Sequence, residues 1–153
     1  MKTLSVILSG IVLLTALAVF AEDAPSHIMA VIKERVAREH PYDYDSRERA
    51  IERQKNAYFE IRDCEDEGIP EVLLTRIKEK AASECPHNYC AQKYLIDVQI
   101  KDFLYIQNYS AKDVPEEVLE EARKRATREF PDDYSSQKLV IEDQIREYLD
   151  QEY

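Results

Sequence analysis

Six prolines recur in this chain at a constant spacing. They form two series with a spacing of 45 residues, Pro25, Pro70 and Pro115, and Pro41, Pro86 and Pro131. Four further positions hold one residue type in all three segments: Glu39, Glu84 and Glu129; Tyr44, Tyr89 and Tyr134; Ile51, Ile96 and Ile141; and Gln54, Gln99 and Gln144. Average residue usage would give on the order of 0.2 such identities by chance. The chain therefore carries three copies of one unit, placed at residues 22–66, 67–111 and 112–153.

Each unit has the pattern of two helices joined by a short turn. The first proline suits the beginning of a helix, where its missing N–H is not needed, and apolar residues such as Leu73 and Ile77 follow at helical spacing. The second proline ends that helix, and Asp43, Asn88 and Asp133 are good N-caps for the next one. The sequence predicts an all-α fold of three antiparallel helical hairpins, stacked as a short solenoid-like bundle.

The second helix of the middle copy is apolar on nearly every side. Its apolar residues are Tyr94, Leu95, Ile96, Val98, Ile100, Phe103, Leu104 and Ile106. The matching positions of the first copy include Arg49, Arg53 and Lys55. Because a helix that is apolar all round is buried all round, the two outer copies are expected to act as polar-faced caps on the middle one.

Residues 1–21 have the form of a secretory signal peptide. Lys2 precedes an apolar run over 4–20, and the small residues Val19 and Ala21 stand at the positions that a signal peptidase reads. The alternative is an uncleaved anchor, although the run is slightly short for a membrane span. We expect an exported protein, periplasmic or extracellular, with one domain over 22–153. Its net charge of −10 argues against binding to nucleic acid or, after cleavage, to anionic membranes.

Catalysis has little support in the sequence. Only two glycines are present, Gly10 in the leader and Gly68, which excludes glycine-rich phosphate loops and dinucleotide fingerprints. The three histidines, His27, His40 and His87, form no HExxH motif, and no serine lies in a nucleophile elbow. We therefore predict no catalytic residue and no cofactor.

The cysteines suggest a disulfide instead. Cys85 and Cys90 flank the turn of the middle copy, and in an oxidising compartment we expect a bond across that turn. Cys64 is placed at the opposite end of the unit and is expected to stay unpaired or to join a second chain in a dimer. A metal site made of Cys85, His87 and Cys90 is a weaker alternative, because no fourth ligand is evident.

The tyrosine and glutamine that recur in each copy are interpreted as packing residues. Each tyrosine is expected to plug a hairpin turn, and each glutamine amide to satisfy a backbone or hydroxyl group within the stack. These residues are Tyr44, Tyr89, Tyr134, Gln54, Gln99 and Gln144. Function in such a stack comes from residues that differ between copies. The candidate partner contacts are the tyrosines outside the shared set, Tyr42, Tyr105, Tyr109 and Tyr153.

The shared residues also make up a recognisable string, P-x-x-Y-x6-I-x-x-Q-x3-[YF]. In the first copy it reads Pro41, Tyr44, Ile51, Gln54 and Tyr58. It resembles a repeat of exported bacterial proteins without an established function, which carry Trp before the motif proline where this chain has His40, Cys85 and Phe130. The resemblance covers the whole chain after the leader and implies neither a named family nor an activity. The Trp-Leu-Gly-Tyr signature of tetratricopeptide units is absent.

These patterns favour an exported, non-catalytic interaction or scaffold module with an unknown protein partner. The alternative is a small secreted inhibitor or effector that presents an acidic loop to the basic cleft of an enzyme. A thiol or metal module built on Cys85 to Cys90 is the weakest of the three.

Overall fold

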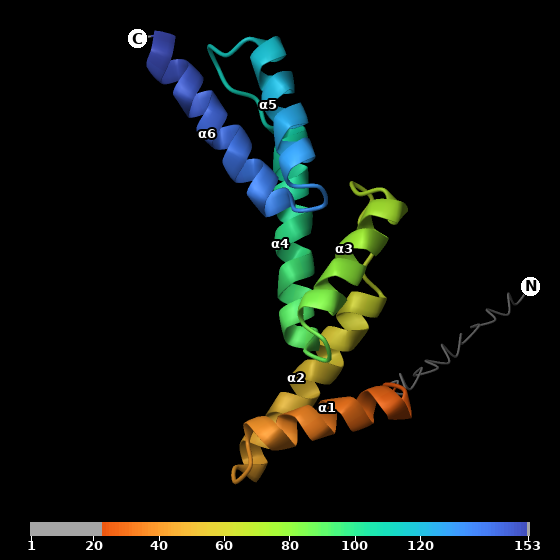
Figure 1. Cartoon of the computed structure of the whole chain (residues 1–153). Helices are drawn as coiled ribbons and strands as arrows, with labels where there is room; N and C mark the ends of the chain where they lie inside the picture. Colours follow the sequence, from red (N-terminus) through yellow and green to blue (C-terminus); the bar gives the residue numbers. More distant parts are fainter. Residues whose placement is uncertain (1–22, 153) are drawn as a thin grey trace, which may run out of the picture.

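A computed structural model describes residues 23–152 and shows an all-α fold, as predicted, with no strand among those residues (Figure 1). The six helices are α1 (Ser26–Glu39), α2 (Tyr44–Arg62), α3 (Glu71–Glu84), α4 (Tyr89–Asn108), α5 (Glu116–Glu129) and α6 (Tyr134–Glu152). The first residues of α1, α3 and α5 are 45 positions apart, and so are those of α2, α4 and α6. The predicted leader lies outside the described residues. None of the helices described is long and apolar enough to cross a bilayer.

The first helix of each unit begins one residue later than the sequence predicts. Pro25, Pro70 and Pro115 are the N-caps of α1, α3 and α5 and not their first helical residues. A proline serves there because the capping residue contributes its carbonyl to the helix, as Pro70 does by accepting a bond from the N–H of Leu74 at 3.0 Å. Its missing N–H is not required.

The second helix of each unit is capped by an Asx side chain, as predicted. The side chains of Asp43, Asn88 and Asp133 accept a hydrogen bond from the backbone N–H three residues later, at 2.9, 3.2 and 3.1 Å. Each bond satisfies one of the N–H groups that the first turn of a helix leaves free.

A further side chain closes each hairpin turn, at a position that the sequence analysis did not single out. Gln92 Nε2 donates to the carbonyl of Cys85 at 2.8 Å, and Gln137 Nε2 donates to that of Phe130 at 2.7 Å. In the first unit Arg47 takes this place, and its Nε donates at 2.6 Å to the carbonyl seven residues before it. The position escaped notice because the copies share a donor here and not a residue type.

The units are joined through their second helices. Helix α4 packs on both α2 and α6, and each of α1, α3 and α5 packs on the second helix of its own unit (Figure 1). The main hydrophobic cluster belongs to the second and third units, and a smaller one belongs to the first. The largest fully buried side chains are Ile96 and Ile141 in the main cluster and Ile32 and Val36 in the smaller one.

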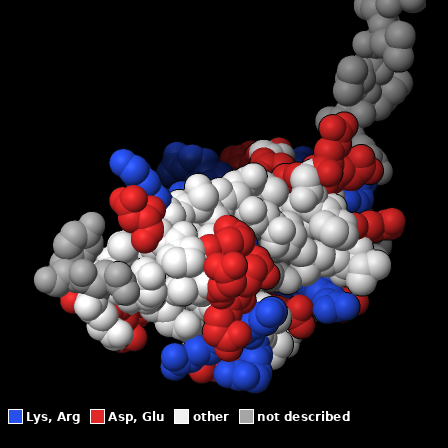
Figure 2. Space-filling model, turned by 90° about the horizontal axis from the view of Figure 1, so that it is seen from above, with Lys and Arg blue, Asp and Glu red and all other residues white. Residues whose placement is uncertain are grey.

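The expectation that α4 is buried on every side is only partly correct. Ile96 is 0% exposed, but Tyr94 is 68% exposed. The reason is geometric, because the three neighbours α2, α3 and α6 leave one side of α4 open. Seen from above, the molecular surface is largely uncharged, with acidic groups across its middle and Lys and Arg mostly towards its margin (Figure 2).

Candidate functional site

At the interface between the second and third units, Gln99 of α4 binds the beginning of α6. Its Oε1 accepts a hydrogen bond from the backbone N–H of Tyr134 at 2.8 Å. Its Nε2 lies 3.4 Å from both Asp133 Oδ1 and Ser135 Oγ. One side chain therefore satisfies a free N–H at the beginning of α6 and also holds the capping residue in place.

Gln54 makes a similar pair of hydrogen bonds one unit earlier, although its backbone donor lies one residue further along the helix. Its Oε1 accepts from the N–H of Cys90 at 3.2 Å, and its Nε2 donates to Asn88 Oδ1 at 3.0 Å. The Gln54 side chain is 7% exposed. In both interfaces the repeated glutamine thus binds the beginning of the next unit's second helix.

An edge-to-face aromatic pair accompanies each glutamine. The ring centroids of Tyr58 and Tyr89 are 5.3 Å apart, and those of Phe103 and Tyr134 are 5.2 Å apart. At both interfaces the repeated tyrosine therefore packs on an aromatic ring of the preceding unit. Tyr44 is 75% exposed. It belongs to the first unit, and the described residues include no helix of a preceding unit on which it could pack.

One kind of ion pair recurs at both interfaces. The preceding unit supplies an acid and the following unit supplies a lysine, which stands five residues after the capping residue. Lys93 Nζ lies 3.6 Å from Glu60, and Lys138 Nζ lies 3.1 Å from the buried carboxylate of Asp102. Both lysines lie on the second helix, one turn beyond its beginning, so the charge pairs extend the contact made by the glutamine.

Lys80 of α3 adds a contact to the cap of α6. Its Nζ lies 3.1 Å from the carbonyl of Asp132 and 3.5 Å from the carboxylate of Asp133. Burial alone would raise the pKa of Asp133. The N–H of Ser136, the amide of Gln99 and the charge of Lys80 outweigh it, so the pKa is held below its usual value of 3.8.

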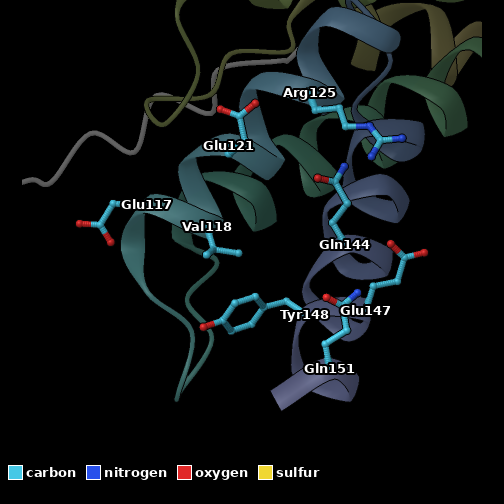
Figure 3. Close-up of a pocket in the computed structure, with 8 residues that line it drawn as sticks. All are labelled: Glu117, Val118, Glu121, Arg125, Gln144, Glu147, Tyr148 and Gln151. Atoms are coloured by element: carbon cyan, nitrogen blue, oxygen red, sulfur yellow. The ribbon is translucent and has the colours of Figure 1, made fainter. Parts of the chain in front are cut away.

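The third glutamine of the series has no such partner among the described residues. Gln144 Nε2 is buried and makes no hydrogen bond. It lies in a shallow hollow of about 410 Å³ between α5 and α6, which we call the α5–α6 groove (Figure 3). The residues that line this groove are Glu117, Val118, Glu121, Arg125, Gln144, Glu147, Tyr148 and Gln151.

The α5–α6 groove repeats the surface on which the third unit sits. Counted 45 residues back, its side chains match those of the second unit that contact the beginning of α6: Arg125 matches Lys80, Gln144 matches Gln99, Glu147 matches Asp102, and Tyr148 matches Phe103. In Figure 3, Gln144 and Tyr148 extend from α6 towards α5, with the Tyr148 ring near Val118. The groove thus offers a hydrogen-bonding amide, an aromatic ring and both signs of charge.

The candidate partner tyrosines fall in two places. Tyr42 is 93% exposed in the turn of the first unit. Tyr105 and Tyr109 lie together near the end of α4, with ring centroids 5.3 Å apart, and Lys138 Nζ lies 4.7 Å from the Tyr105 centroid. Tyr153 lies outside the described residues. Of the three described tyrosines, Tyr42, Tyr105 and Tyr109, none lines the α5–α6 groove.

Tyr105 provides a prediction for alkaline pH. Burial, together with a hydrogen bond to Glu142, raises its pKa to about 12. Since this folded value exceeds that of an unfolded tyrosine, about 10, the contribution to stability is complete below pH 10 and is lost between pH 10 and about 12. Titration of tyrosinate absorbance should show a component near pH 12 that disappears in Tyr105→Phe and in urea. A native titration without that component would contradict the assignment.

The disulfide expected between Cys85 and Cys90 is not found. Cys64, Cys85 and Cys90 are all free, and no pair lies at disulfide distance. The backbone explains this, because Cys85 is the C-cap of α3 whereas Cys90 lies in the first turn of α4, whose N–H groups face Gln54 of the preceding unit. A short spacing across the turn therefore does not bring the two thiols together.

Thiol titration tests this arrangement. Denatured protein without reductant should yield three reactive thiols per chain. In the native protein Cys90 should react slowest, because burial raises its pKa and only the thiolate is nucleophilic. Cys90→Ser should remove the slow phase alone. Recovery of a single thiol in denaturant would instead show that a disulfide forms.

The predicted alternative of a metal site is not supported by the arrangement of side chains. Among residues 23–152 no three His, Cys, Asp or Glu side chains gather in a way that could hold a metal ion. His87 is exposed, in a left-handed backbone conformation with φ 61°.

Comparisons with protein families, with curated proteins and with solved structures found no match for this chain.

Proposed function

We propose that this chain is an exported, non-catalytic helical-repeat protein that binds another protein through the α5–α6 groove. The observation that supports this function is the buried amide nitrogen of Gln144, which has no hydrogen-bond partner among residues 23–152. A buried polar group left unsatisfied costs about 1–3 kcal/mol. A bound protein that accepted a bond from Gln144 would recover that free energy, as the next unit does at Gln54 and Gln99.

Export rests on the apolar leader followed by small residues, and the absence of catalysis rests on the lack of nucleophile and metal motifs in the sequence. The alternative function is that of a secreted inhibitor or effector. It would use an acidic loop and not the groove, so the two functions differ in which surface they require.

Capture of partners from the exported fraction of the source cells separates the two functions. Immobilised protein should retain a partner that Gln144→Leu and Tyr148→Ala each reduce at least tenfold. Tyr94→Ala is the matched control, because Tyr94 is exposed on α4 and does not line the groove. Equal retention by all variants would refute the groove as the binding site. Capture of a basic hydrolase that is inhibited by the unmodified protein and by all three variants would establish the alternative function of an inhibitor.

A further inference from the structure

We infer that the α5–α6 groove receives the beginning of a helix from a different protein chain. This helix starts with an Asp or Asn cap, continues with an aromatic residue, and carries Lys or Arg five residues after the cap. The inference rests on the proposed function and specifies the partner that the groove would bind. It follows from the two interfaces between units inside this chain. At each of them the structure shows which residues lie on the surface that corresponds to the groove.

Both internal occupants have the same chemistry. The first is the run from Asn88 and Tyr89 to Lys93, and the second is the run from Asp133 and Tyr134 to Lys138. In each case the cap binds a glutamine amide, the tyrosine packs edge-to-face on an aromatic ring, and the lysine meets an acid. Three contacts separated by fixed intervals along one helix define a specific partner surface.

The groove presents the complement of each contact. Gln144 stands where Gln99 binds the cap, and Tyr148 stands where Phe103 packs on the tyrosine. Arg125 stands where Lys80 approaches the carboxylate of Asp133. Arg125 Nε already donates to Glu129 at 2.8 Å, so an Asp cap would meet the remaining N–H groups of the guanidinium.

The charge of the groove selects a basic residue. In the second unit the ammonium of Lys138 lies against Asp102 and Tyr105, which provide one negative charge. Counted 45 residues later, these positions hold Glu147 and Asp150, which provide two. Glu147 lines the groove and Asp150 follows on the same helix, α6. This part of α6 is therefore more acidic than the corresponding internal surface, and a cation five residues after the cap is favoured.

A second copy of this chain does not fit. Its first unit begins α2 with the suitable cap and ring of Asp43 and Tyr44, but Asp45 and Glu48 then occupy the positions of Ser135 and Lys138. These acids would face Glu147 and Asp150, and like charges across an interface are repulsive.

The turn before α2 also differs in shape from the two turns that dock inside the chain. His87 and Asp132, each one residue before the cap, have φ values of 61° and 58°, whereas Tyr42 at the matching position is not in this left-handed conformation. The first turn is held instead by Arg47, which donates to two successive carbonyls. Both charge and shape therefore point to a different chain as the partner.

The partner chemistry can be tested with peptide probes and the ¹⁵N-labelled chain over residues 22–153, which contains all six helices. The first probe is a peptide of residues 131–150, held helical by a staple on the side that does not dock. The second is a matched peptide of residues 41–60. We expect the first to shift the side-chain amide resonance of Gln144 and to saturate, and the second to bind at least tenfold more weakly.

Charge reversal gives the decisive comparison. Lys138→Glu in the first peptide should weaken binding at least tenfold, and Glu147→Lys in the protein should restore it. Gln144→Ala in the protein should weaken binding of the first peptide without changing the helical content of the protein.

Failure of a helical first peptide to move any groove resonance at millimolar concentration would overturn the inference. If the groove variants still abolished partner capture, the proposed function would stand without it. Equal binding of the 41–60 peptide would also overturn the inference, and would identify the groove as a site of self-association.

Discussion

Replacing Ile96 with alanine will lower the free energy of unfolding by about 3–5 kcal/mol, a large share of the about 5–15 kcal/mol that stabilises a typical domain. Ile96 is 0% exposed within the main hydrophobic cluster, on the helix that contacts three others. Its removal leaves a cavity that these neighbours cannot close together, because α2 also packs on α1 and α6 also packs on α5.

The repeat supplies a matched control for that prediction. Ile51 stands at the same position of the first unit but is only half-buried, beside the smaller cluster. Ile51→Ala should cost about 1–2 kcal/mol, since less apolar surface is lost and neighbouring side chains can relax. Urea denaturation followed by circular dichroism measures both values. An equal loss of unfolding free energy in the two variants would mean that the middle unit is no better packed than the first.

The helices could be predicted from the sequence because their limits are set locally. A proline followed by helical spacing, and an Asx residue after the second proline, act within one turn of the chain. What the sequence left open was which unit each repeated side chain contacts. Gln99 and Tyr134 recur in a way that marks them as structural, but only the packing of α4 on α6 shows that they meet across an interface.

The errors also have physical causes. Cys85 and Cys90 are close in sequence, yet the end of one helix and the beginning of the next orient them towards different neighbours. Gln92 and Gln137 escaped notice because Arg47, their counterpart, makes the same hydrogen bond with a different residue type. The groove could not be predicted either, since Gln144 stands out only once its two counterparts are seen to be bonded.

Replacing the three repeated glutamines one at a time should therefore give unequal results. Gln99→Ala removes the acceptor for the N–H of Tyr134 and the donor to Asp133, and should cost about 2–4 kcal/mol. Gln54→Ala breaks the matching pair of bonds at the other interface and should cost about 2–3 kcal/mol. Gln144→Ala should cost less than about 0.5 kcal/mol, or stabilise the protein slightly, because it removes a buried amide nitrogen that has no partner.

Urea denaturation gives the three free energies, and hydrogen exchange at the N–H of Tyr134 reports the interface directly. That N–H should exchange faster in Gln99→Ala and at the native rate in Gln144→Ala, because only Gln99 accepts its hydrogen bond. The proposed binding role requires that the cost at Gln144 be smaller than the cost at Gln99. A Gln144 amide that was already hydrogen-bonded in the isolated chain would gain no new bond from a partner. A loss at Gln144 as large as that at Gln99 would show that its amide is satisfied in the free protein and would remove the main support for the groove as a binding site.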